Sequence, residues 1–214
     1  MQVQSKRSSR GVRLAQAFLL GVVVGVTAQL FRQVDGPLQF LGAGIAPWVT
    51  IGFVLTVWSV RGHHSIRASG LLGAETMGVY LLVWLVSYHS LFVIRESVEI
   101  SAGWREAFPW VVLAGPLCLA LGFVAALTHR RGIVGDASIA LPLAWSLPEI
   151  VDSLQLGWPQ AAVVLAAVAL LPIVVSGRRD VSLARVALMS ALFGGAAVVI
   201  VPIVFAGVRS LIGQ

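Results

Sequence analysis

Residues 14–31, LAQAFLLGVVVGVTAQLF, decide the fold class of this chain. The stretch contains no charged residue, and it directly follows the basic segment KRSSRGVR at residues 6–13. A helix of about 20 mostly apolar residues is long enough to cross the hydrocarbon core of a bilayer. The two features together predict a first membrane span whose basic flank stays in the cytoplasm.

The same stretch has the outline of a secretory signal, with small residues at Val26-Thr27-Ala28 that resemble a cleavage site. Its apolar run, however, is longer than the 7 to 15 residues that are usual for the core of a signal peptide. A retained membrane anchor is therefore the preferred interpretation, and a cleaved signal is the alternative.

The composition extends this interpretation to the whole chain. Of its 214 residues, 58% are hydrophobic and only 11% are charged, whereas soluble domains carry about a quarter charged residues. The net charge is +6, but the basic residues stand in small groups between apolar segments. They form no stripe of arginine and aromatic residues of the kind that binds nucleic acid. We therefore expect the lipid bilayer, and no nucleic acid, as a partner.

The apolar segments are continuous rather than alternating, which favours helices over the strands of a membrane barrel. The sequence thus predicts an all-α fold, a polytopic transmembrane helix bundle of about seven spans. The predicted spans are residues 14–31, 43–60, 69–94, 109–128, 134–156, 160–176 and 186–208. Residues 14–208 form one transmembrane domain, between a basic cytoplasmic segment, 1–13, and a short C-terminal tail, 209–214.

Orientation follows from the lysines and arginines, because cytoplasmic loops carry an excess of them. With seven alternating spans, 11 of the 15 fall on the side of the N-terminus. They are Lys6, Arg7, Arg10, Arg13, Arg61, Arg67, Arg130, Arg131, Arg178, Arg179 and Arg185. The other four are Arg32, Arg95, Arg105 and Arg209. We therefore expect the N-terminus inside and the C-terminus outside.

Three smaller patterns concern helix packing and the membrane boundary. Gly21 and Gly25 form a GxxxG pair, which permits close approach of a second helix. The polar stretch 95–108 is expected to form a short helix along the outer surface. Four tryptophans fall near the outer boundary, where indole rings favour the headgroup region. They are Trp48, Trp104, Trp110 and Trp158.

Ionisable side chains inside a span are expensive, at about 2.5–3.5 kcal/mol for a central Asp, and they often mark a functional site. Glu149 and Asp152 lie three positions apart in the span 134–156 and therefore share one helical face. Trp145 extends that face inward, and Pro148 frees a backbone carbonyl beside it. These residues predict a polar notch in the outer half of the span.

The span 69–94 carries Tyr88 and His89 at a similar outer depth, and Trp48 belongs to the span 43–60. We therefore expect an outward-opening pocket formed by Glu149, Asp152, His89, Tyr88, Trp145 and Trp48. Its carboxylates would favour a cation or an organic amine. The alternative is structural: Asp152 marks the point at which the helix meets water, and Glu149 pairs with Arg95, Arg105 or His89.

The remaining polar residues indicate little chemistry. Glu75 is expected to cap its helix or to pair with Arg61 or Arg67. His63-His64 lacks a third nearby ligand, so no metal site is predicted. The sequence contains no HExxH, P-loop or GxSxG motif. It therefore predicts no catalytic residue and no cofactor.

Ala46-Pro47-Trp48, Phe53, the short basic loop that follows, and residues 78–88 together carry a resemblance. The pattern resembles a family of uncharacterised multi-pass membrane proteins of high-GC Gram-positive bacteria, classed as a domain of unknown function. The similarity extends over about residues 17–206. It implies a multi-pass protein of a bacterial plasma membrane, and it supplies neither an activity nor catalytic residues.

The expected function is binding or transport of a small cationic or amine-bearing solute through the outer acidic pocket. The first alternative is a non-catalytic membrane scaffold or accessory subunit that acts through helix contacts. An intramembrane enzyme comes third. The sequence does not decide whether a protein partner or a second copy of the chain is involved.

Overall fold

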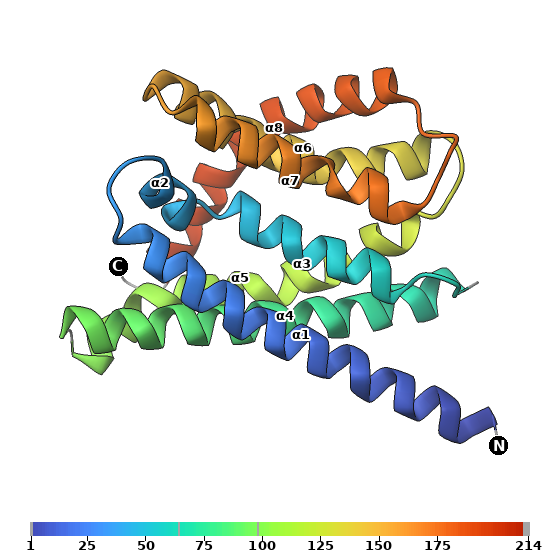
Figure 1. The fold of residues 1–214 in the computed structure, drawn as a ribbon, viewed down its shortest axis with the longest axis horizontal. Helices are drawn as coiled ribbons and strands as arrows, with labels where there is room; N and C mark the ends of the chain where they lie inside the picture. Colours follow the sequence, from blue (N-terminus) through green and yellow to red (C-terminus); the bar gives the residue numbers. More distant parts are fainter. Residues whose placement is uncertain (1, 64, 98, 212–214) are drawn as a thin grey trace.

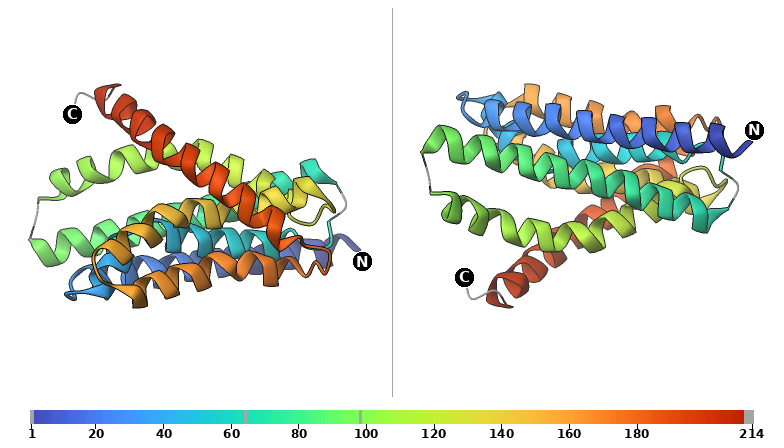
Figure 2. Two further views of the ribbon diagram at one scale, coloured as in Figure 1. Left: turned by 90° about the horizontal axis from the view of Figure 1, so that it is seen from above. Right: turned by 90° about the horizontal axis from the view of Figure 1, so that it is seen from below.

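The computed structural model describes residues 2–63, 65–97 and 99–211, and all regular secondary structure in this part is helical. His64 and residues 212–214 of the predicted tail lie outside it, as do the side chains of Lys6, Arg7 and Arg209. The helices are α1 (Gln2–Arg32), α2 (Pro37–Ala43), α3 (Ala46–Ser59), α4 (Ile66–Glu96), α5 (Ile100–Leu127), α6 (Ile133–Gln155), α7 (Pro159–Ser176) and α8 (Leu183–Leu211). They form a bundle of long, roughly antiparallel helices, which α8 crosses obliquely (Figures 1 and 2).

The connections gather at the two ends of the bundle. The N-terminal end of α1 and the α3–α4, α5–α6 and α7–α8 connections lie at one end (Figure 1). The α1–α2, α4–α5 and α6–α7 connections lie at the other. We call the first the basic end, because its connections carry the arginine groups at 61–67, 130–131 and 178–185. This grouping is the one expected from the arginine pattern, while the side of the membrane that each end faces stays a prediction.

Four helices of the described residues are long and apolar enough to cross a membrane: residues 10–32 of α1, and α4, α5 and α7. The α2–α3 pair counts as a fifth if it is one bent span. α6 contains three acidic residues and two internal prolines, and the apolar part of α8 among the described side chains, Leu183–Ala196, is short. The fold is therefore compatible with a membrane helix bundle of four to five apolar spans, and seven spans remains a prediction.

The helix boundaries add detail at three segments. The basic N-terminal segment is helical and continues directly into the first span, because α1 runs without interruption from Gln2 to Arg32. The expected surface helix at 95–108 is absent, because most of this stretch is the first part of the long helix α5. The span expected at 43–60 corresponds to α3, but a short helix that was not expected, α2, precedes it and meets it at an angle of 60°.

The core lies between α1, α3 and α4, where Phe53, Met77 and Tyr80 are at most 1% exposed. The GxxxG pair on α1 explains the close contact with α4. A Cβ atom at Gly21 would lie 2.9 Å from the Tyr80 carbonyl oxygen, and one at Gly25 would lie 2.7 Å from that of Trp84. The outer surface, in contrast, presents large apolar side chains such as Val163 and Val174, 68% and 75% exposed. Lipid tails solvate such a surface far better than water does.

Candidate functional site

The break between α2 and α3 is the most unusual backbone feature of the bundle. α2 ends at Ala43, Gly44 is extended, and α3 starts at Ala46 with Pro47 in its first turn. The first N–H groups of any helix lack partners within the helix. Inside a membrane such groups need partners from the protein, because irregular backbone is tolerated there only where it is buried or lines a cavity.

Glu149 of α6 supplies those partners. Its Oε1 atom accepts hydrogen bonds from the backbone N–H groups of Ile45 and Ala46, each at 2.9 Å. A carboxylate at this position also complements the positive end of the α3 dipole. The other oxygen, Oε2, lies against Gly44, and a Cβ atom there would overlap it. The absence of a side chain at Gly44 therefore allows Glu149 to reach the backbone.

Two buried polar atoms at this break, Oε2 of Glu149 and Nε1 of Trp48, have no hydrogen-bond partner among the described residues. Trp48 is 6% exposed and packs against Phe31, with the ring centroids 6.3 Å apart. Such groups normally hydrogen-bond to protein, water or ligand. We call Glu149 and Trp48 the break site.

Trp145 lies one turn before Glu149 on α6 and is half-buried. With Val49, Thr50 and Phe53 of α3 it lines a crevice of about 10 Å³. A single water molecule needs about that much space. Trp145 therefore packs α6 against α3, and the crevice as it stands admits no larger ligand.

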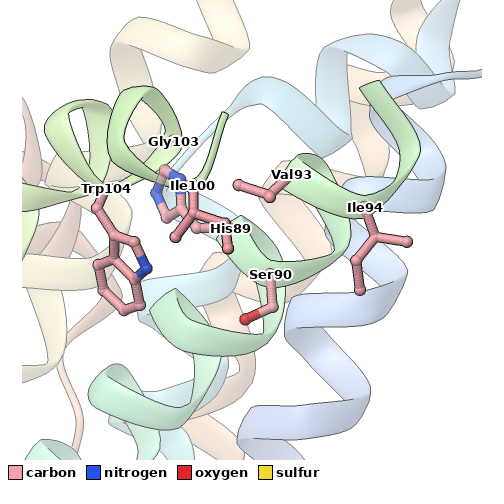
Figure 3. A pocket seen from close by; sticks show the side chains of 7 residues that line it. All are labelled: His89, Ser90, Val93, Ile94, Ile100, Gly103 and Trp104. Atoms are coloured by element: carbon pink, nitrogen blue, oxygen red, sulfur yellow. The ribbon is translucent and has the colours of Figure 1, made fainter. Parts of the chain in front are cut away.

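Tyr88 and His89 belong to a different environment. The Tyr88 hydroxyl accepts a hydrogen bond from Arg32 Nη1 at 2.9 Å, and the Tyr88 and His89 rings meet edge to face at 5.2 Å between centroids. His89, 7% exposed, lines a cleft of about 240 Å³ between α4 and α5, opposite Trp104 (Figure 3). Most of the other lining side chains are apolar.

The six side chains of the expected pocket therefore divide into separate groups. Glu149, Trp48 and Trp145 lie around the first turns of α3, whereas Tyr88 and His89 lie with Arg32 and the α4–α5 cleft. Asp152 is exposed near the end of α6, as the structural alternative anticipates. Glu149 bonds to backbone N–H groups rather than to Arg95, Arg105 or His89. Trp48 is buried at the start of α3, whereas a position in the headgroup region was expected.

Glu75 also differs in its partner. It pairs with Arg10 of α1, whose Nε and Nη2 atoms both contact the carboxylate, with Nε 3.0 Å from Oε2. The expected partners were Arg61 and Arg67, which are closer in the sequence. This ion pair joins the first turns of the α1 span to α4 at the basic end.

Sequence reasoning missed Asp136, which is fully buried in the first turn of α6. Its Oδ1 accepts a hydrogen bond from Arg178 Nη2 at 3.0 Å, and its Oδ2 lies 2.8 Å from Arg185 Nε. Arg178 also donates to both carboxylate oxygens of Asp180, each at 3.1 Å. The hydrogen bond from Arg178 lowers the pKa of Asp180 below its ordinary value. An acidic residue just after Arg130-Arg131, at a helix start, was the available signal.

Fold and surface together are those of a multi-pass helical membrane protein. One comparison with known proteins agrees. The chain is similar to a lipoprotein signal peptidase of Rhizorhabdus wittichii, 26% identical over 118 residues. The match covers 55% of this chain and 64% of the length of that protein, less than two thirds. The chain matches no protein-family model, and no solved structure matches it.

Proposed function

We propose that this chain is a multi-pass protein of a bacterial plasma membrane that binds a small cationic or amine-bearing solute at the break site. The observation that carries the proposal is the carboxylate of Glu149. One oxygen accepts hydrogen bonds at the break between α2 and α3, and the other is buried without a hydrogen-bond partner among the described residues. Broken spans whose half-helices end at a buried site are the usual location of solute binding in membrane carriers.

The chemistry around the break supports a positively charged donor. Oε2 of Glu149 is an acceptor, and an ammonium group offers several N–H donors. Trp48, in the first turn of α3, and Phe31, which packs against it, add aromatic faces, and such faces attract cations. An anionic solute would instead meet the negative charge of Glu149. The break site is closed in this structure, and the proposal requires that it widens when the solute binds.

Thermal unfolding of the purified chain in detergent tests it, with methylamine, ethanolamine and choline as probes and acetate as the anionic control. We expect at least one amine to raise the midpoint of wild type, and Glu149→Gln to abolish the rise. Asp152→Asn is the matched control, because its carboxylate is exposed and it should keep the response. If no amine acts on wild type, or if Glu149→Gln responds equally, Glu149 is a structural cap and the scaffold alternative gains.

A second candidate, peptide hydrolysis, is favoured by the similarity to a lipoprotein signal peptidase. Hydrolysis by carboxyl groups needs one to act as acid and one as base. Glu149 and Asp152 share one face of α6, whereas Glu75 and Asp136 are each engaged by arginine. The acid and base proposed for this candidate are therefore the carboxyl groups of Glu149 and Asp152.

Its test is cleavage of the signal peptide from a lipoprotein precursor by membranes that contain the chain. Hydrolysis predicts cleavage above that of membranes without the chain, and its loss in both Glu149→Gln and Asp152→Asn. This candidate would be excluded if cleavage survives both substitutions, or if membranes with the wild-type chain show no cleavage. The amine-binding proposal, in contrast, predicts that Asp152→Asn is silent.

A further inference from the structure

A second cluster of polar side chains lies at the basic end of the bundle, apart from the break site. It consists of the arginines of the α5–α6 and α7–α8 connections with Asp136 and Asp180. Five arginines face two carboxylates there, so the cluster carries a clear excess of positive charge. Four of the five are exposed: Arg130, Arg131, Arg179 and Arg185. We call the five arginines together the arginine surface.

The two carboxylates act as an internal frame for this surface. Asp136, 0% exposed, holds Arg178 and Arg185 from below, at 3.0 and 2.8 Å. Asp180 holds Arg178 from the side of the connection, at 3.1 Å. The Arg178 side chain is only 6% exposed, and its Nη1 atom has no acceptor among the described residues. The frame thus fixes the guanidinium groups of Arg178 and Arg185, and the cluster keeps an excess of positive charge.

The two connections also touch each other. The Arg130 carbonyl oxygen and Arg178 Nη1 both lie so close to Gly135 that a Cβ atom there would overlap them. The charge of Arg131 adds to the effect of Arg178 in lowering the pKa of the Asp180 carboxyl. Arginines that are about 50 positions apart in the sequence therefore form one continuous surface.

Neighbouring apolar residues show the depth of the arginine surface in the bilayer. Ile133 and Val134 begin α6 and are 60% and 52% exposed, and Leu183 begins α8 and is 66% exposed. Side chains of this kind belong in hydrocarbon, yet they directly adjoin the arginines. The arginine surface therefore lies at the boundary between lipid tails and water, which is where headgroup phosphates are found.

We propose that the arginine surface binds the phosphate of an anionic membrane lipid. Guanidinium groups bind phosphate oxygens through two parallel N–H donors, and neighbouring arginines can share one phosphate. Basic pockets between membrane helices bind anionic headgroups in this way. Asp136 is a positioning residue, since it orients Arg178 and Arg185 and lies below the surface that meets the lipid.

The experiment compares retention of phosphatidylglycerol and of phosphatidylcholine by the purified chain, measured by native mass spectrometry. We expect wild type to prefer phosphatidylglycerol. The double variant Arg131→Gln/Arg179→Gln removes two exposed charges and should weaken phosphatidylglycerol binding at least about tenfold. The matched control, Arg95→Gln/Arg105→Gln, removes two charges at the opposite end and should bind as wild type does.

Two results would overturn the proposal. Equal weakening in both double variants would mean that overall charge, and not this surface, selects the lipid. Competition by soluble inorganic phosphate or glycerol 3-phosphate at millimolar concentration would mean that the surface binds a free phosphate compound. The substituted side chains are exposed, so each variant should fold. Far-ultraviolet circular dichroism checks that it does.

Discussion

Glu149 accepts a hydrogen bond from the backbone N–H group of Ala46, 103 positions earlier in the chain, at 2.9 Å. The contact ties the second half of α6 to the first turn of α3. It makes one carboxylate the cap of a helix to which it does not belong. A broken membrane span and the acidic residue that closes the break are thus two parts of one structural unit.

The first prediction separates the two roles of Glu149. Glu149→Ala leaves two buried N–H groups without an acceptor, at about 1–3 kcal/mol for each. Glu149→Gln keeps a carbonyl oxygen that can accept both, so its loss of stability should be clearly smaller. Thermal unfolding in a single detergent measures the difference. Similar midpoints for the two variants would show that the cap contributes little to stability.

A second prediction concerns the contact between α1 and α4. A Cβ atom at Gly25 would lie 2.7 Å from the Trp84 carbonyl and 2.8 Å from Ser87 Cβ. Gly25→Ala should therefore destabilise the fold by about 1–3 kcal/mol, as overpacking does. Gly115 on α5 has nothing within 4 Å of such an atom, so Gly115→Ala should be neutral or slightly stabilising. The contact assigned to α1 and α4 would be wrong if both alanines behaved alike.

The third prediction contrasts a buried with an exposed ion pair. Asp136 is fully buried, and Asp136→Asn removes the counter-charge of Arg185 and one of the two that face Arg178. We expect a loss of about 3–5 kcal/mol. Glu75→Gln breaks a pair whose Arg10 side chain is 62% exposed, so at most about 1 kcal/mol should be lost. Urea unfolding of the detergent-solubilised variants ranks them, and the reverse order would contradict the burial described for Asp136.

The fourth prediction tests the orientation of the bundle. Reporter fusions after Arg131 and after Arg179 should be active on the cytoplasmic side, because basic loops stay inside. A fusion after Gly157, in the α6–α7 connection, should be active outside. A fusion after Arg131 that reports the outer side would reverse the assignment made from the arginines.

Sequence reasoning located the apolar helices well. The span expected at 160–176 is α7, Pro159–Ser176, because a continuous apolar run between a proline and a glycine has few other solutions. The GxxxG pair was also informative, since a small-residue face requires a close neighbour. The prediction does not name that neighbour, and the structure identifies it as α4.

The partners of the charged residues could not be read in this way. Arg10 and Glu75 are 65 positions apart, and no periodicity connects them. Glu149 looked like a pocket residue because it is acidic and lies within a span. Its role as a cap depends on the break at Gly44. The sequence is apolar on both sides of Gly44 and so does not reveal that break. Asp136 was missed for a similar reason, because its two arginines follow a whole further helix.

Photo-crosslinking with an alkylamine that carries a diazirine tests the central claim, that an amine binds where Glu149 closes the break. Mass spectrometry of the labelled wild type should locate the crosslink in residues 44–48 or 145–149. An excess of the same amine without the diazirine should reduce this labelling, and the Glu149→Gln variant should not be labelled there. Labelling in the cleft between His89 and Trp104 instead, or labelling that Glu149→Gln leaves unchanged, would contradict the account.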